Sequence, residues 1–359
     1  MIATPYRGLQ ASLRVVALLS VLLSVEAHCA TASMEWRLSA PMPEARAGYA
    51  AGVVEGQLLV AGGTYWLGDP GAWMGKVFCA TTQAFDPVSE TWTRLPDAPV
   101  KFGYAAGAAT EDRLYVLGGV QDGRPSGRVL VLEKHARVFH WREGPPLPEA
   151  RVFAEAAVVQ GKIFVVGGSR EFETMDDTGL CCASLTATTT VWSLDPGDPA
   201  ATWERHAPFP GHRRWSHRLA AVGRYLYQFG GRFLARKDQP VQYFNEVWRY
   251  DTRSDEWAKV AEMPVEIQLA RAVQVDGVIA LVGRDKCSIV FDPSSGSFAS
   301  IPGLPEDALV DYFAWIPPFL VGAGGETRLE RPRRRAEWTF LGKLTPGRSV
   351  AHDTSDPTR

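Results

Sequence analysis

The sequence predicts an all-β fold, a six-bladed β-propeller in which the N-terminal strand completes the C-terminal blade. Three observations predict it: an apolar segment repeatedly ending in paired glycines, a recurring aromatic strand with a Pro-containing exit, and a turn-rich composition. The 359 residues include 34 Gly, 25 Pro and 12 Trp, and helical spacing of apolar residues is hard to find. Such a chain is typical of many short strands joined by tight turns.

The repeat is anchored by an apolar strand that runs into one or two glycines. Six copies occur, and the fifth, GVIALVGR, is degraded. Their last residues are Gly63, Gly119, Gly168, Gly231, Arg284 and Gly325. Consecutive anchors lie 41 to 63 residues apart, which brackets a period of about 50 residues.

Each repeat supplies four strands. A strand of small residues precedes the anchor and suits the innermost position of a blade, where strands crowd around one axis. An aromatic strand follows the anchor, and a fourth strand carries an aromatic residue before a Pro-containing exit. Because one four-stranded sheet cannot bury both of its faces, the blades must stack in a ring.

The two ends of the chain predict how the ring closes. The segment EWRLSAPMP from Glu35 matches a fourth strand, whereas AEWTFLG from Ala336 matches a third. Pairing of these two segments would complete the last blade and remove two free sheet edges. We expect structural roles between blades for the repeated tryptophans, namely Trp36, Trp92, Trp141, Trp203 and Trp257.

The paired glycines, the aromatic strand with Asp-Pro and the recurring Trp resemble kelch repeats, over nearly all of residues 35–342. The resemblance implies the propeller fold. It leaves function open, because propellers carry many unrelated activities.

Residues 1–32 have the pattern of a secretory signal. Met1 to Arg14 carry two arginines and no acid, Val15 to Val25 are apolar, and small residues precede Ser33. The apolar run is too short to span a bilayer comfortably. We expect cleavage after Ala32, a propeller over residues 33–343 and a disordered polar tail over 344–359. The mature protein is expected to be periplasmic or secreted, without membrane attachment.

The composition also limits partners and cofactors. With 38 basic and 40 acidic residues, nucleic acid is not an expected partner. Four cysteines follow the leader, and their pairing is not readable from sequence: Cys79, Cys181, Cys182 and Cys287. We expect no cofactor and no metal, because His212 and His217, five residues apart around an aromatic residue, lack the spacing of a ligand pair.

The candidate site lies where the loops after each anchor and the connections into each innermost strand emerge together. Basic residues recur in these connections as Arg46, Arg151, Arg213 or Arg214, and Arg271. Arg232, in the loop after the fourth anchor, and Arg284, at the end of the fifth anchor, join them. Guanidinium groups suit a carboxylate or a sugar, so we predict Arg46, Arg151, Arg214 and Arg232 as substrate-binding residues. For Arg46 and Arg151, hydrogen bonding between blades is an equal alternative.

Glu326 directly follows the last paired glycines, in GGETRLERPRRR. This segment resembles a motif of bacterial kelch proteins that act as N-acetylneuraminate epimerases or mutarotases, although the long insertions of that family are not evident in this chain. The resemblance implies that Glu326 transfers the proton and that Arg333 is the nearest counterpart of a following catalytic Arg. A base that takes the proton of the anomeric hydroxyl would fit this role. Two alternatives stay open: a surface ion pair of Glu326 with Arg331 or Arg333, and a noncatalytic propeller that binds glycan or protein.

Overall fold

The computed structural model describes residues 33–67, 76–172, 186–236, 239–264, 270–283, 288–305, 308–327 and 338–345. The predicted leader lies outside these ranges, as do Cys181, Cys182 and Cys287. The last strand runs to Thr345, two residues past the predicted end of the propeller. Within the described part of the chain, no helix has the length and apolar character needed to cross a membrane.

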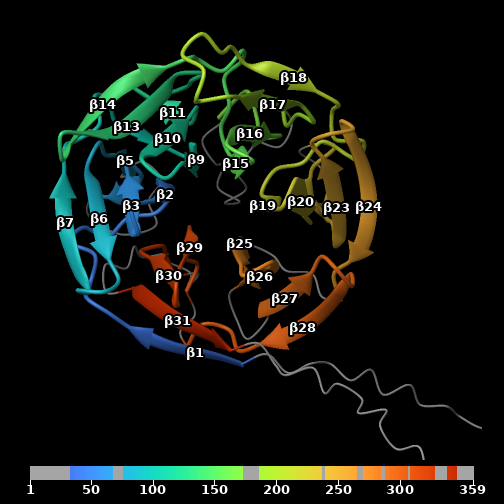
Figure 1. Cartoon of the computed structure of the whole chain (residues 1–359). Helices are drawn as coiled ribbons and strands as arrows, with labels where there is room; N and C mark the ends of the chain where they lie inside the picture. Colours follow the sequence, from blue (N-terminus) through green and yellow to red (C-terminus); the bar gives the residue numbers. More distant parts are fainter. Residues whose placement is uncertain are drawn as a thin grey trace, which may run out of the picture.

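The described strands include six antiparallel four-stranded sheets arranged around a central axis (Figure 1). Each sheet is one blade, whose strands follow one another from the innermost outward. Blade one is β2 (Ala50–Val54), β3 (Gln57–Ala61), β6 (Thr82–Asp86) and β7 (Thr91–Leu95). Blade two is β9 (Ala106–Ala109), β10 (Arg113–Leu117), β13 (Val129–His135) and β14 (Val138–Gly144). Blade three is β15 (Glu155–Val159), β16 (Lys162–Val166), β17 (Val191–Leu194) and β18 (Glu204–His206).

The second half of the ring repeats this plan. Blade four is β19 (Arg218–Val222), β20 (Tyr225–Phe229), β23 (Glu246–Asp251) and β24 (Glu256–Glu262). Blade five is β25 (Arg271–Val275), β26 (Val278–Val282), β27 (Ser288–Asp292) and β28 (Ser297–Ile301). Blade six is β29 (Phe313–Ile316), β30 (Phe319–Ala323), β31 (Thr339–Thr345) and β1 (Ser33–Leu38).

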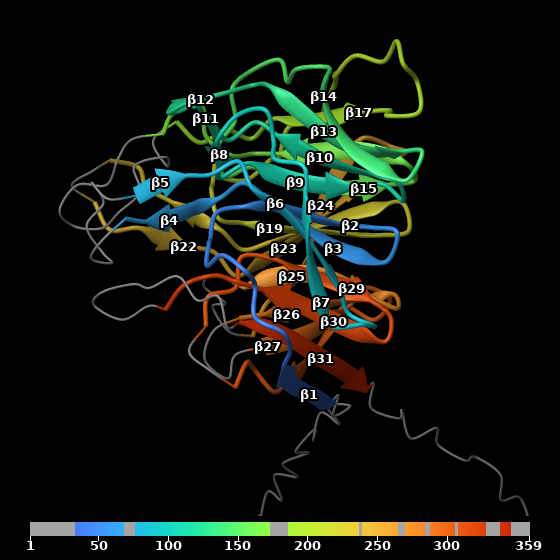
Figure 2. The same cartoon turned by 90° about the vertical axis from the view of Figure 1, so that its left-hand side faces the viewer.

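Short strands decorate the loops between the second and third strands of three blades. In blade one, β4 (Thr64–Trp66) pairs with β5 (Lys76–Phe78). In blade two, β11 (Val120–Gln121) pairs with both β12 (Arg124–Pro125) and β8 (Phe102–Gly103). In blade four, β21 (Arg232–Phe233) pairs with β22 (Gln242–Tyr243). Seen edge-on, β4, β5, β12 and β22 project from the same side of the disc (Figure 2).

The ring closes as the two chain ends predicted. Strand β1 pairs antiparallel with β31, and Trp36 lies opposite Gly342. A Cβ at position 342 would come within 2.5 Å of the Trp36 ring, so the glycine makes room for this indole. The first strand of the chain therefore supplies the outer edge of the last blade (Figure 1).

The core is divided among the interfaces between blades. The buried hydrophobic side chains form six clusters, each shared by two neighbouring blades. The predicted structural role of the tryptophans is seen at the rim, where the indole Nε1 of five of them donates to a carbonyl of the preceding blade at 2.9 to 3.3 Å. The donors and acceptors are Trp36 and Pro302, Trp92 and Ala40, Trp141 and Pro96, Trp203 and Pro145, and Trp257 and Ala207.

Candidate functional site

At one end of the central channel, called the mouth below, the loops after the paired glycines meet the connections into the innermost strands. The residue after the paired glycines bridges to the connection that enters the innermost strand of the same blade. Thr64 pairs with Ala47, Ser169 with Val152, Arg232 with Trp215 and Glu326 with Leu309. Glu326 and Arg232 therefore lie on the same rim, the side from which the decorated loops project (Figure 2).

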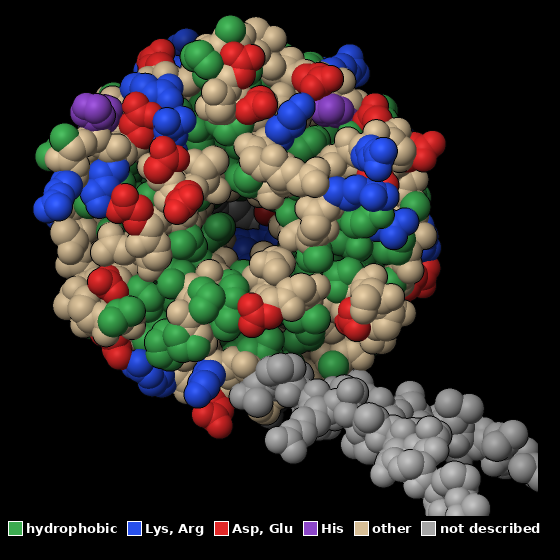
Figure 3. Space-filling view, viewed as in Figure 1, with side chains coloured by type: hydrophobic (Ala, Val, Ile, Leu, Met, Phe, Trp, Pro, Cys, Tyr) green, Lys and Arg blue, Asp and Glu red, His purple; other side chains and the backbone are tan. Residues whose placement is uncertain are grey.

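The opposite face carries the tight turns within each blade. It is hollowed at its centre, where charged side chains are visible inside the channel (Figure 3). The charged side chains inside the channel direct attention to the residues of the innermost strands.

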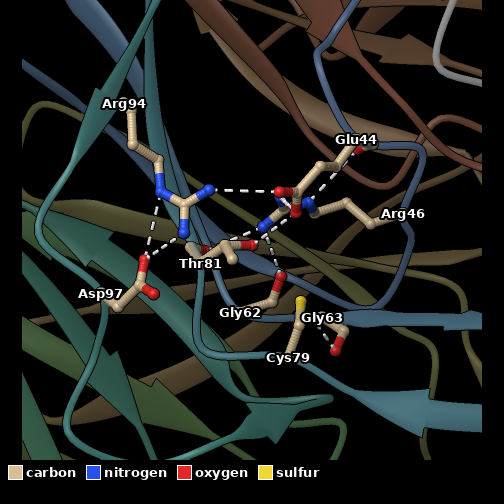
Figure 4. A network of polar contacts seen from close by, with 8 residues as sticks. All are labelled: Glu44, Arg46, Gly62, Gly63, Cys79, Thr81, Arg94 and Asp97. Atoms are coloured by element: carbon tan, nitrogen blue, oxygen red, sulfur yellow. Dashed lines mark hydrogen bonds and ion pairs between the residues drawn. The ribbon is translucent and has the colours of Figure 1, made fainter.

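Arg46 is not positioned at the mouth surface, because its side chain is 1% exposed. Its guanidinium donates to the carbonyls of Gly62 and Thr81 and pairs with Glu44 at 2.7 Å (Figure 4). Glu44 in turn pairs with Arg94 on the rim. These contacts hold the paired-glycine turn in place and match the structural alternative for this residue.

Arg151 and Arg214 occupy the same position in blades three and four and are also buried. Arg214 donates to the carbonyl of Gly230, the counterpart of Gly62, and pairs with Glu246 at 3.0 Å. Arg151 donates to Thr190 Oγ1 at 2.6 Å. Burial lowers the pKa of both guanidinium groups. All three arginines are committed to their own blades, so the ligand role predicted for them has no support from their contacts.

Arg271 does not belong to that repeated basic position, contrary to the sequence prediction. It is the first residue of β25, four places further along the blade than Arg46. The residues at this position in the six blades are Ala50, Ala106, Glu155, Arg218, Arg271 and Tyr312. Two blades thus present alanine at the mouth, and four present a charged or hydroxyl-bearing side chain.

The charged members of this ring are paired. Arg218 Nη1 donates to Glu155 Oε1 at 2.7 Å, and its Nε donates to the carbonyl of Ala270. Arg271 Nη2 donates to Asp311 Oδ1 at 2.9 Å, and Asp311 Oδ2 accepts from the backbone amide of Gly48. Two ion pairs, contributed by four consecutive blades, therefore line one side of the mouth.

Burial and like charges shift the titration of these groups. The pKa of Arg218 is lowered to about 9 by burial first and then by the charge of Arg271. The pKa of Tyr312 is raised to about 12, by burial and by the carboxylate of Glu155. Strongly perturbed groups gathered in a channel mark a candidate functional site.

Arg232 completes the cationic side of the mouth. Its guanidinium stacks on Trp215 with 5.2 Å to the ring centroid, donates to Ser216 Oγ at 2.8 Å, and contributes to the lowered pKa of Arg218. Glu326 is half-buried beside Leu309. The other predicted catalytic residue, Arg333, and Arg284 lie outside the described residues.

The sequence pattern did not reveal Glu155, Arg218, Asp311 and Tyr312 as members of the site. The signal was available, because aligning the small-residue strands places Glu155 and Arg218 in a column that blades one and two fill with alanine. A charged residue at a crowded position that other blades fill with a small residue needs an oppositely charged partner. In the structure a neighbouring blade supplies that partner.

The described residues contain no group of three or more His, Cys, Asp or Glu side chains arranged to hold a metal ion. His212 is stacked between Phe233 and Phe244, while His217 is buried under the mouth. Cys79 is a buried free thiol that contacts the carbonyl of Gly63.

Comparison with known proteins agrees with this architecture. A model of the kelch motif matches residues 45–99 and 213–264, which include blades one and four. The chain has a β-propeller fold with kelch motifs. A solved structure of YjhT superposes with a TM-score of 0.60 at 14% sequence identity, over 74% of this chain and 87% of that one. At this identity the similarity shows the kelch fold alone.

Curated relatives of this kelch propeller are longer proteins. Kelch-like protein terF of Aspergillus terreus (strain NIH 2624 / FGSC A1156) is 27% identical over 69% of this chain. Beta-scruin of Limulus polyphemus is 27% identical over 67%, and Kelch-like protein 35 of Mus musculus is 30% identical over 46%. The chain spans 51% of the length of the first and 24% of each of the other two.

Proposed function

We propose that this propeller binds the carboxylate of an acidic monosaccharide at the mouth and interconverts its anomers. The observation that carries the proposal is the paired charge of Glu155, Arg218, Arg271 and Asp311, beside the guanidinium of Arg232. Guanidinium groups bind a carboxylate through two parallel donors. Arg232, in the loop strand β21 on the rim, would make the first contact.

Glu326 would act as the base in this reaction. It would take the proton of the anomeric hydroxyl, whose electrons form the carbonyl while the bond from the anomeric carbon to the ring oxygen breaks. The ring oxygen takes a proton from an acid, and reclosure on the other face of the carbonyl gives the second anomer. Tyr312 is a candidate for that acid because its hydroxyl stands in the same ring of residues at the mouth; its raised pKa keeps the proton on but makes it a weaker donor.

The resemblance of the Glu326 segment to the N-acetylneuraminate epimerases and mutarotases favours this chemistry. Arg333 would assist if it lies near Glu326. The predicted leader over residues 1–32 adds to the proposal that the protein works in the periplasm or outside the cell.

The test is anomer interconversion followed by NMR with N-acetylneuraminic acid, galacturonic acid and galactose. We expect the protein to accelerate interconversion of the two acidic sugars more than that of galactose. Turnover should be at least about tenfold slower in Glu326→Gln. The KM for the acidic sugars should be higher in Arg232→Met. Glu111→Gln is the matched control, an exposed acid in the turn between β9 and β10 on the opposite face. Absence of acceleration with every sugar would overturn the catalytic proposal, and full activity of Glu326→Gln would exclude Glu326 as the base.

A second candidate is a noncatalytic propeller that binds a protein through the loops around the mouth. Two exposed hydrophobic side chains on these loops favour it: Leu67, beside β4, is 63% exposed, and Tyr243, in β22, is 37% exposed. Capture of a defined partner that Leu67→Glu and Tyr243→Glu abolish, together with no anomerase activity, would establish this function instead.

A further inference from the structure

The other side of the mouth is aromatic. Four partly exposed rings from three blades gather there, and we call them the aromatic shelf: Phe78, Tyr104, Phe153 and Phe172. The Tyr104 ring lies 4.9 Å from that of Phe153, is stacked at 5.3 Å on Phe172, and meets Phe78 edge-on at 6.0 Å. Lys76 borders the shelf, donating to Tyr104 Oη at 2.6 Å and lying 5.1 Å over the Trp66 ring.

Two of these rings are held by strained backbone. Tyr104 and Phe153 have φ of 57° and 54°, in the left-handed region that costs of order 1–3 kcal/mol for such residues. Blade one has Gly48 at the same position, with φ of 67°. A turn of this shape needs only glycine, so bulky aromatic residues here are not explained by the turn itself.

Hydrogen bonds hold this strained backbone in place. They also connect the shelf to the charged side of the mouth, the side lined by the two ion pairs Arg218–Glu155 and Arg271–Asp311. Phe153 N donates to the carbonyl of Tyr104, and Tyr104 N donates to that of Gly48. Gly48 N donates to Asp311, the partner of Arg271. Gly48 also leaves space for the shelf, since a Cβ there would lie 2.7 Å from Tyr104 Cε1. Blades one and two place only alanine at the first position of their innermost strands, so these two strands add no charge to this side of the mouth.

We propose that the aromatic shelf is a second sugar subsite, which binds a pyranose ring linked to the acidic sugar held by the charged side. This inference rests on the proposed function and extends its substrate class from a free monosaccharide to an oligosaccharide whose reducing-terminal unit is acidic. A pyranose presents C–H bonds on its flat faces, and these pack on the electron-rich faces of aromatic rings. The ammonium of Lys76 and the hydroxyl of Tyr104 supply polar contacts for the sugar hydroxyls at the edge. Partly exposed rings with polar groups at their edge suit such a ligand better than a lipid chain, which requires an enclosed apolar surface.

The test compares monosaccharides with dimers that share the same reducing unit, by calorimetry on the full chain. The pairs are galacturonic acid with digalacturonic acid, and N-acetylneuraminic acid with its α2,8-linked dimer. In at least one of these two pairs, we expect the dimer to bind at least about tenfold more tightly than its monomer. Tyr104→Gly and Phe153→Gly should reduce that advantage to less than about threefold while leaving monomer affinity unchanged. Glycine adopts positive φ freely, so both variants should remain folded.

Gln160→Gly is the matched control, an exposed residue with φ of 47° in the β15 to β16 turn on the opposite face. It should keep the full dimer advantage. Equal binding of monomer and dimer, or a dimer advantage that survives in Tyr104→Gly and Phe153→Gly, would overturn the subsite while leaving the proposed function intact. Binding of no sugar at all would overturn the proposed function together with the subsite.

Discussion

Arg218 and Glu155 form an ion pair of 2.7 Å across the boundary between blades three and four. The two sides of this pair differ in exposure: the Arg218 side chain is 9% exposed and that of Glu155 is 28% exposed. Because Arg218 also donates to Ala270 at the start of blade five, one guanidinium ties three consecutive blades together at the mouth.

This asymmetry predicts unequal effects of breaking the pair. Glu155→Leu strands a buried cation and should cost about 3–5 kcal/mol of unfolding free energy. Arg218→Met should cost less, because water can rehydrate the carboxylate that remains. The double variant should be more stable than Glu155→Leu alone. Urea unfolding of the three proteins measures these differences, and strictly additive losses would contradict the coupling.

Arg46 and Arg94 test whether the buried arginines are structural. Both contact Glu44 (Figure 4), but Arg46 is 1% exposed and Arg94 is 51% exposed. Arg46→Met should lower the unfolding free energy by about 2–4 kcal/mol, because it removes the guanidinium donor from the Gly62 carbonyl and one of the two donors from the Thr81 carbonyl. Arg94→Met should change it by less than about 0.5 kcal/mol.

Sugar affinity provides the second measurement on these variants. If Arg46 is structural, folded Arg46→Met should bind acidic sugars as the parent protein does. A variant that unfolds normally but loses sugar binding would return Arg46 to the ligand-binding set.

The fold was predictable from sequence because its determinants are local and repeated. Three local features predicted the four-stranded blades and the pairing of β1 with β31: the paired glycines, the aromatic residue at each outer strand, and the third-strand and fourth-strand patterns at the two chain ends. The site was harder to predict, since its contacts join residues of different blades: Glu155 with Arg218, and Asp311 with both Arg271 and Gly48. Repeat patterns show which residues each blade contributes, but they do not show whether a side chain is buried. Arg46 was therefore predicted to face a ligand, whereas its side chain is buried within its own blade.

The closing strand offers a test of how the ring is locked. Because a Cβ at residue 342 would lie 2.5 Å from Trp36, Gly342→Ala must displace the indole and should cost about 1–3 kcal/mol. Trp36→Leu in the same chain frees that space, so the double variant should lose less than the sum of the two single losses. Thermal unfolding measures this. Additive losses would mean that the indole does not limit the space at residue 342.

His217 predicts how stability changes with pH. Burial first, and then the charges of Arg214 and Arg218, lower the pKa of His217 to about 3, whereas the unfolded chain titrates near 6.5. Between about pH 6.5 and 3, His217 is therefore protonated in the unfolded state but neutral in the folded state. Stability should be lost as the pH falls from about 6.5 toward 3, with a slope that approaches about 1.4 kcal/mol per pH unit.

The interval from about pH 6.5 to 5 is the informative one, because most carboxylates stay ionised in both states there. Urea unfolding at several pH values should show that His217→Gln loses most of this slope, whatever its absolute stability. His135→Gln, which changes an exposed histidine in β13, should keep it. Equal slopes in the parent protein and His217→Gln would show that the buried imidazole takes up its proton in the folded state, and that the arginines around it do not prevent this.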